Sequence, residues 1–288
     1  MEVRETIRAL VALDARVGGD RTAARALRAF RSAPVHGRDA MAAAGELGEV
    51  TGWLLFDAGR HRLAERVNRA ALRLSRRAGD RAVELLTLQN MALHAGYVGR
   101  PRAALDIIGQ VLSGPLSPRL EALFRLREAR ARALAGDRDA PRLFARVRSR
   151  YLDGVRDDDP AWTWWIDDPE LAWHEAMVHG HAGDWARAAD LFHAAAELVP
   201  ADQVRRRYLH LAALLGAQAR AGARRDAEDT LTAVLPYYRA VGSTRTDAIV
   251  RAHAVRITGP SAVMATVCSE WAARLPSRVR RVQPSSST

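Results

Sequence analysis

Between residues 62 and 77 the chain alternates charged and apolar positions with the spacing of an α-helix. One stripe is made of arginines three or four residues apart: Arg62, Arg66, Arg69, Arg73, Arg76 and Arg77. The opposite face is apolar and carries Leu63, Val67, Ala70 and Leu74. A period near 3.6 residues predicts an amphipathic helix whose apolar face is buried. The arginine stripe is predicted to be its hydrated face, with a surface for a polyanion or a partner as the alternative.

A second pattern, of small residues, repeats along most of the chain. The motif Gly-x-x-x-x-Ala begins at Gly19, Gly59, Gly99, Gly183 and Gly222, and a sixth copy, at Gly136, has Pro141 in the alanine position. Successive copies are about 40 residues apart. Seven residues before the glycine, five copies have another small residue: Ala12, Gly52, Ala92, Ala129 and Ala176. The sixth copy has Leu215 there.

This spacing predicts a helical hairpin in each copy. Glycine ends the first helix because it adopts a positive φ without steric cost, and the small residues let two helices approach closely. A single hairpin cannot bury its apolar face, so neighbouring hairpins must stack. We therefore expect an all-α fold, an α-solenoid of about six hairpins over residues 1–258. A capping helix is predicted for residues 259–275 and a disordered basic, serine-rich tail for residues 276–288.

The best copy of the repeat is HAGDWARAADLFHAAAELVP, residues 181–200. Its Gly183, Trp185, Ala188, Phe192 and closing Pro200 resemble the tetratricopeptide pattern, and the resemblance extends over residues 10–240. It implies that the first helix of each hairpin lines a concave groove. It also implies that Asn90 stands where peptide-binding members of the family bond a ligand backbone, although their carboxylate-clamp lysines are absent.

Composition narrows the chemistry. The formal net charge of +11 comes from arginine, because the sequence contains no lysine. Phosphate-loop, Schiff-base and kinase-type lysines are therefore excluded. One cysteine, Cys268, excludes an internal disulfide and a cysteine-based zinc site. No apolar run suits a membrane span or a signal peptide, so we expect a cytoplasmic protein.

Residues 157–181, DDDPAWTWWIDDPELAWHEAMVHGH, concentrate acids, histidines and four of the seven tryptophans. They begin in the longest gap between repeats, so residues 153–168 are predicted to be an insertion between hairpins. Insertions in solenoids often lie on the functional face. Asp168-Pro169-Glu170 predicts a helix start with Asp168 as N-cap, and Ser117 is predicted to cap the helix that restarts near Pro118.

The chemistry of this stretch remains open. Glu170, His174 and His181 share one helical stripe and could ligate a metal together with aspartates of the insertion. Asp159 and Asp167 are the alternative of a catalytic acid pair, although a loop does not define their separation. Mixed polar side chains also commonly line solenoid grooves, so we expect no metal and no cofactor.

The tryptophans of the stretch have two interpretations. Trp162, Trp164 and Trp165 lie in the predicted insertion, and Trp173 lies on the following helix, one turn before Met177. They either seal an irregular junction between hairpins or form the aromatic wall of a pocket for a ligand or partner.

The predicted ligand site combines that wall with the concave groove. From the insertion it takes Trp162 and Trp165. From the first helices it takes Trp53, Asp57, Gln89, Asn90, Tyr97, Arg127, Arg130, Glu170, Trp173, His174, Met177 and His181. Further groove positions are Glu46, Glu49, Phe56, Leu93 and Arg220. Acids at one end, arginines in the middle and aromatic rings throughout favour a peptide or a polar small molecule, with a hydrated face that binds no ligand as the alternative.

Several longer strings carry a closer resemblance. AAAGELGEVTGWLLFDAGRH, LSRRAGDRAVELLTLQNMALHAGYVGRPRAAL and RSRYLDGVRDDDPAWTWWIDDPELAWHEAM are similar to the C-terminal tetratricopeptide region of actinobacterial XRE-type helix-turn-helix transcriptional regulators. The resemblance covers residues 3–257. It implies a region that senses a signal or dimerises, next to a DNA-binding module that would precede Val3. We therefore expect no direct DNA binding by the residues present.

Together these observations favour a regulatory binding module that receives a peptide, a small-molecule signal or a partner protein in its groove, with a homodimer as an open alternative. A scaffold for assembly that binds no ligand is the second hypothesis. The third is a biosynthetic enzyme with its site at residues 157–181.

Overall fold

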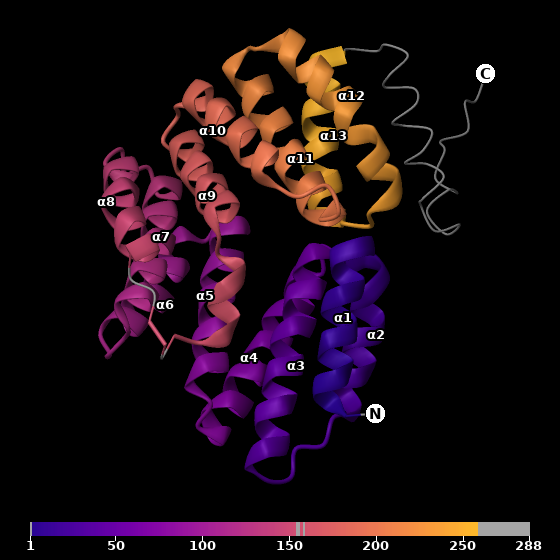
Figure 1. Cartoon of the computed structure of the whole chain (residues 1–288), viewed down its shortest axis with the longest axis vertical. Coiled ribbons are helices and arrows are strands. Elements are labelled where there is room, and N and C mark those ends of the chain that lie inside the picture. Colours follow the sequence, from indigo (N-terminus) through magenta and orange to yellow (C-terminus); the bar gives the residue numbers. More distant parts are fainter. Residues whose placement is uncertain (1, 154–155, 158, 259–288) are drawn as a thin grey trace, which may run out of the picture.

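The structure, a computed structural model, describes residues 2–153, 156–157 and 159–258, and of Asp153, Trp164, Trp165 and Thr258 only the backbone (Figure 1). Within these residues it contains thirteen α-helices, one 3₁₀ helix at Ala161–Trp165 and no strand. The α-helices are α1 (Val3–Val17), α2 (Gly19–Ser32), α3 (Arg38–Asp57), α4 (His61–Ala78), α5 (Arg81–Tyr97), α6 (Pro101–Leu112), α7 (Pro118–Leu134), α8 (Ala140–Asp153), α9 (Asp168–His181), α10 (Trp185–Leu198), α11 (Val204–Ala221), α12 (Arg224–Ala240) and α13 (Thr244–Thr258).

The predicted all-α fold is confirmed for the described part of the chain. The capping helix predicted for residues 259–275 and the tail predicted for residues 276–288 lie outside the described residues. Among the helices described, none is long and apolar enough to cross a membrane.

The odd-numbered helices form an inner layer and the even-numbered helices an outer one. In the inner layer α1 contacts α3, α3 contacts α5, α5 contacts α7 and α7 contacts α9. Each even-numbered helix packs between two inner helices, as α4 does between α3 and α5. Inner helices therefore bury most of their circumference, whereas an outer helix keeps one hydrated face. On α4 that face holds the arginine stripe, and all six arginines are exposed as predicted.

Left-handed glycines end the inner helices in the predicted repeats. The φ angles are 68° at Gly59, 76° at Gly99, 96° at Gly183 and 79° at Gly222. The alanine five residues after each of them is buried: Ala64, Ala104, Ala188 and Ala227. In these four copies the predicted turn and the close approach of the next helix are both confirmed.

Two copies differ from the predicted register by one residue. In the first copy the left-handed glycine is Gly18 (φ 79°) and the buried alanine is Ala23, each one position earlier than predicted. In the copy that begins at Gly136, Ala140 is fully buried in the alanine role and Pro141 is half-buried. The motif alone could not choose between adjacent small residues, because the turn geometry decides which one faces the neighbouring helix.

The small residue before each glycine allows the close packing that was predicted, except at the start of the chain. A Cβ on Gly52 would lie 1.7 Å from Oδ1 of Asn68 on α4, so only glycine fits there. Ala92, Ala129 and Ala176 are also buried. Ala12 is exposed, because α1 buries a different face.

Of the two predicted helix N-caps, one is confirmed and the other is wrong. The Ser117 hydroxyl accepts a hydrogen bond from the Leu120 N–H at 3.3 Å, as predicted. The cap of α9 is Asp167, whose Oδ1 accepts from the Glu170 N–H at 3.1 Å. The prediction of Asp168 as this cap is wrong, because Asp168 already lies inside the first turn and only the preceding residue has the extended backbone of an N-cap.

The two ends of the helix array meet. α1 contacts α11 and α13 contacts α3, so the inner layer closes on itself (Figure 1). Two backbone hydrogen bonds join the turns there: the Gly242 N–H donates to the Val17 carbonyl and the Asp20 N–H donates to the Gly242 carbonyl, both at 2.9 Å. A Cβ on Gly18 would lie 2.4 Å from the Gly242 oxygen, so the approach requires glycine.

Asp57 lies at this junction and is 1% exposed. Its Oδ2 accepts from the Gly19 N–H at 3.0 Å, and its Oδ1 accepts from the Ser243 hydroxyl at 2.9 Å. Arg245 donates to Oδ1 from two nitrogens, at 3.1 and 3.2 Å, and a nitrogen of Arg205 lies 3.6 Å away. Burial raises the pKa of the Asp57 carboxyl, but Arg205 and Arg245 outweigh it and hold the pKa below its ordinary value. Asp57, predicted to line an open groove, instead joins the first helix pairs to the last helix.

We expect Asp57→Asn to lower the free energy of unfolding by about 3–5 kcal/mol, the range for removing one partner of a buried ion pair. Urea denaturation followed by circular dichroism measures this. Asp106→Asn, at an exposed carboxylate of α6, is the control and should change stability by less than about 0.5 kcal/mol. Because the folded pKa of Asp57 is depressed, its contribution is present above pH ~4 and is lost as the pH falls through the folded value. Equal stability of the two variants would contradict the role of this charge.

Candidate binding site

A buried chain of hydrogen bonds crosses the inner helices α5, α7 and α9. Nε and Nη2 of Arg127 donate to Oε1 of Gln89 at 3.2 and 3.0 Å. Nη1 of Arg127 lies 3.1 Å from Nδ1 of His174, and Nε2 of His174 lies 3.0 Å from Oε1 of Glu170. Nη1 of Arg127 also contacts Nε2 of the same ring, so both ring nitrogens of His174 lie close to the guanidinium group. Burial and then Arg127 lower the pKa of His174 to about 3. The structure thus brings four of the predicted groove residues together.

The chain of hydrogen bonds continues from α5 to α3. Nε2 of Gln89 donates to Oδ1 of Asn90 at 2.6 Å, and the Asn90 amide donates to Oε1 of Glu49. Glu49 is 4% exposed, and burial raises its pKa to about 7. Asn90, predicted to bond a ligand backbone, therefore already serves an internal carboxyl group.

A second group of inner side chains surrounds Trp173 of α9. The Arg130 guanidinium stacks on its ring, with Cζ 5.2 Å from the ring centroid. The His210 ring, on α11, has its centroid 6.3 Å away. His181 follows Trp173 by about two turns on the same helix. Arg130, Trp173 and His181, all predicted site residues, are named here the inner polar cluster.

Each member of the inner polar cluster has a buried polar atom without a hydrogen-bond partner among the described residues. These atoms are Nη1 of Arg130, Nε1 of Trp173 and Nε2 of His181. Arg130 and Trp173 are each only 6% exposed. About nine in ten buried polar groups in proteins are bonded to protein or to ordered water. Three unpartnered groups on two neighbouring helices are therefore typical of a place that receives water or a ligand.

The cluster carries an uncompensated positive charge. Burial, followed by the charges of Arg127 and Arg245, lowers the pKa of Arg130 to about 9, so its guanidinium is still protonated at pH 7. Burial, followed by the charges of Arg130 and Arg220, lowers the pKa of His181 to about 3, so its ring is neutral. In the described part of the chain no carboxylate lies within ion-pair distance of Arg130. A buried cation without a counter-ion is costly in free energy.

The space left inside is small. Arg127 and Arg130 line a cavity of about 10 Å³ between α5 and α7. The rest of its wall is formed by Ala92, Leu93, Gly96, Ala131 and Leu134. This volume is about the minimum that holds one water molecule. The extended open groove expected from the sequence is therefore largely filled by its own side chains.

Trp53 and Tyr97 belong to an aromatic group beside the Asp57 junction. The ring centroid of Phe56 lies 5.7 Å from that of Trp53 and 5.0 Å from that of Tyr97. The guanidinium carbons of Arg205 and Arg245 lie 5.4 and 5.2 Å from the Trp53 centroid. Trp53 is thus held between internal cations, whereas Tyr97 is 36% exposed at the edge of the group.

The remaining predicted residues are in structural contacts or outside the described residues. Nε1 of the half-buried Trp162 donates to the Ala82 carbonyl at 2.9 Å, which ties the predicted insertion to α5. Met177 is half-buried and packs against the apolar cluster around Trp173. The side chain of Trp165 lies outside the described residues.

The insertion does not bring the acids of the predicted catalytic pair together. Asp159 accepts a hydrogen bond from the Ser117 hydroxyl at 2.6 Å, and Asp167 caps α9 and pairs with Arg206. Glu170 and His174 are in contact, but no three acidic, histidine or cysteine residues in the described ranges are placed to hold a metal ion.

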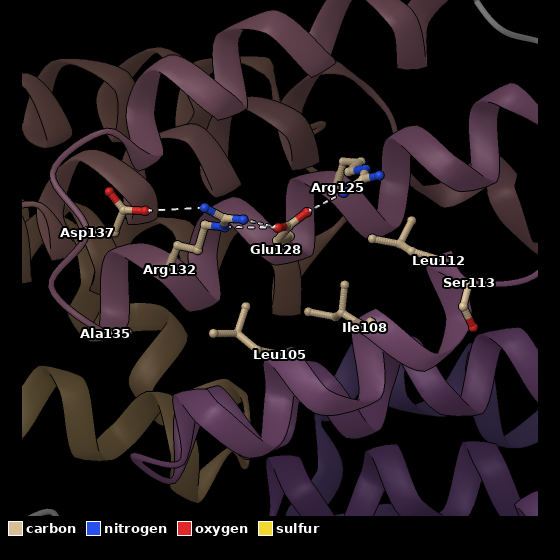
Figure 2. A pocket seen from close by; sticks show the side chains of 10 residues that line it. Leu105, Ile108, Leu112, Ser113, Arg125, Glu128, Arg132, Ala135 and Asp137 are labelled. Carbon is tan, nitrogen blue, oxygen red and sulfur yellow. Dashed lines mark hydrogen bonds and ion pairs between the residues drawn. The ribbon is translucent and has the colours of Figure 1, made fainter.

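An open groove lies on the outer side, between α6 and α7, and was not predicted (Figure 2). Its volume is about 620 Å³. Leu105, Ile108 and Leu112 of α6 form one wall. On the opposite wall Glu128 pairs with Arg125 at 3.0 Å and with Arg132 at 2.6 Å. The groove joins an apolar face to a ladder of charges, a pairing that only the packing of these two helices creates.

Sequence reasoning missed the polar residues of the last inner helices. Arg205 and His210 lie on α11, and Arg245 and His253 on α13, and all four are largely buried. His210 and Arg205 stand before Gly222, so the repeat already placed them on a first helix. Arg245 and His253 follow the last copy of the repeat, and no signal in the sequence pointed to them.

No protein family, curated protein or solved structure that was compared with this chain matches it.

Glu49 gives a pH-dependent test of the inner network. Its folded pKa of about 7 exceeds the ordinary 4.5, so ionisation penalises the folded state as the pH rises between these values. Glu49→Gln keeps an acceptor for Asn90 and removes the penalty. We expect its stability relative to wild type to increase between pH 5 and pH 8 by up to about 3 kcal/mol, measured by urea denaturation. Glu121→Gln, at an exposed glutamate, should show no such trend, and a flat difference for Glu49→Gln would contradict a buried acid here.

Proposed function

We propose that this chain is a regulatory binding module, a tetratricopeptide-like α-solenoid whose inner helices receive a small molecule, a peptide or a segment of a partner protein. One observation carries the proposal: the unpartnered polar atoms of Arg130, Trp173 and His181 gather on the inner face of α7 and α9. Buried polar groups are ordinarily hydrogen-bonded, so three unpartnered groups on two neighbouring inner helices favour recognition of something that supplies the missing bonds.

The alternation of inner and outer helices supports the solenoid interpretation. The odd-numbered helices from α1 to α9 contact one another in order, as do α11 and α13, and a glycine turn with a buried alanine recurs at the spacing of the repeat. Tetratricopeptide arrays place their ligand-contacting residues on the first helix of each pair. Twelve of the predicted site residues lie on the inner helices α3, α5, α7 and α9.

The regulatory part of the proposal rests on the resemblance to XRE-type regulators. In that interpretation the chain senses a ligand or partner and passes the signal to a DNA-binding module, or to a protein that has one. In that interpretation the DNA contacts are made by this module or partner. The exposed arginines of α4 are not interleaved with aromatic residues that could stack on bases, which agrees with DNA binding by a separate module.

A ligand larger than a water molecule requires two helix pairs to move apart, because the inner cavity holds only about 10 Å³. We expect the helices to separate at the junction between the beginning and the end of the helix array. It is closed by polar contacts to Asp57 and two backbone hydrogen bonds, which water can replace, instead of by a continuous apolar interface.

A scaffold for assembly is the second candidate, and the outer groove between α6 and α7 favours it. A groove of about 620 Å³ with an apolar wall and a charged wall suits a segment of a partner protein (Figure 2). In this alternative the inner face stays closed and only the outer surface binds.

Native mass spectrometry of the purified full chain separates these candidates. We expect an adduct of defined mass on the wild-type chain. Trp173→Phe keeps an aromatic ring beneath Arg130 but removes the Nε1 donor and part of the ring area, so it should weaken retention of the adduct about five- to tenfold. Trp185→Phe, on the outer helix α10 beneath Arg220, is the matched control and should retain it.

Two results would contradict the inner site. One is a wild-type chain that carries no adduct and gains no thermal stability from a mixture of polar metabolites. The other is an adduct that both tryptophan variants retain equally, which would point to the outer groove. A dimer would be visible in the same spectra.

A further inference from the structure

Arg127 and Arg130 are buried arginines of the inner site that form no ion pair with a carboxylate among the described residues, although the charge of Glu170 favours the protonated form of both. The inference drawn from them deepens the function proposed above. The N–H groups of Arg127 contact Gln89 and His174, both of which are uncharged. Arg130 has the Trp173 ring on one side and an unpartnered Nη1. The two cations lie close enough for the charge of Arg127 to disfavour the protonated form of Arg130.

Glu170 and Asp57, two carboxylates of the inner helices, are already paired with other groups. Glu170 faces His174 at 3.0 Å and Arg206 at 3.8 Å. Asp57 accepts from Arg245 and has Arg205 3.6 Å away. The inner layer therefore contains more positive than negative charge around Arg130.

Cation–π stacking offsets only part of this cost. Stacking on an aromatic ring stabilises a cation by less than burial without a counter-ion destabilises it. A counter-ion would offset the remainder, and Arg127 and Arg130 both line the small cavity. The cavity holds about one water-sized atom, so it can take a single oxygen of an anionic group, whereas the rest of that group requires the helices to move apart.

We propose that Arg130 and Arg127 bind the anionic group of the ligand, a carboxylate or a phosphate, whose leading oxygen occupies the cavity between α5 and α7. Nη1 of Arg130 donates to that oxygen. The fork of donors on a guanidinium matches both kinds of oxyanion. The neutral His181, on the adjacent helix, offers a further donor at Nε2 to the same group. The rest of the ligand lies toward Trp173, which provides an aromatic face.

Thermal unfolding and calorimetric titration of the full chain test this with sodium phosphate, sodium acetate and sodium chloride at one ionic strength. We expect phosphate or acetate to raise the midpoint of unfolding above its value in chloride. A response to acetate alone assigns a carboxylate, and a response to phosphate alone assigns a phosphate. Equal midpoints in all three salts would overturn the proposal.

Arg130→Met makes the test specific. Methionine removes the buried charge and fills a similar volume, so the response to the oxyanions should disappear. In chloride the variant should be as stable as wild type or more stable, because it no longer buries an unpaired cation. Arg69→Met, on the exposed stripe of α4, is the control and should keep the full response. An undiminished response in Arg130→Met would overturn the proposal.

Arg130→Lys covers the case in which the methionine variant does not fold. Lysine keeps the charge but lacks the planar set of N–H donors that can bind two oxygens at once. The affinity for the responding anion should therefore fall about tenfold or more. An affinity equal to wild type would exclude Arg130 from the site. The two proposals also fail differently. Suppose that Trp173→Phe loses the adduct while the wild-type chain responds to neither phosphate nor acetate. The proposed binding module would then stand, and the proposed anion site would be overturned.

Discussion

The buried carboxylate of Asp57 joins the beginning of the helix array to its end, beside a second buried carboxylate, Asp14, whose Oδ1 lies 3.3 Å from Nε of Arg205. A charge that is 1% exposed must be paired and hydrogen-bonded, because its removal from water costs several kcal/mol. The groups that satisfy it come from α2, α11 and α13, and Arg245 is 188 residues away in the chain. Asp57 can therefore be satisfied only when the two ends meet, so closure of the inner layer and burial of its polar residues depend on the same contact.

Closure gives the inner layer two kinds of polar group. Gln89, Arg127, His174 and Glu170 satisfy one another across three helices and make that region rigid. Arg130 and its neighbours keep unpartnered atoms and an excess of positive charge. Evolution commonly removes such groups from a core that has no other use for them, since an apolar replacement is often more stable. Their presence in the middle of the molecule is the observation on which the proposed binding function rests.

The same residue type has opposite roles in the two layers. The arginines of α4 face solvent, where an ion pair such as Arg69 with Glu65 contributes little to stability. Arg127, Arg130 and Arg245 are buried, where the energetics of each depends on what lies within a few ångströms. Net charge therefore describes the hydrated surface of this protein and does not locate its site. The groove between α6 and α7 is a separate surface from the inner polar cluster.

The local features of this chain follow from its sequence alone. Glycine turns, buried alanines and the amphipathic face of α4 arise from spacings within about 40 residues, which the repeat makes visible. Most of the predicted groove residues were also assigned to the correct inner helices. Only the tertiary structure decided whether that face is open or closed, which acids are already paired and which donors lack a partner. The reason is physical: closure depends on contacts such as Asp57 with Arg245, between residues far apart in the chain, and no local periodicity encodes how far the stacked helices curve before their ends meet.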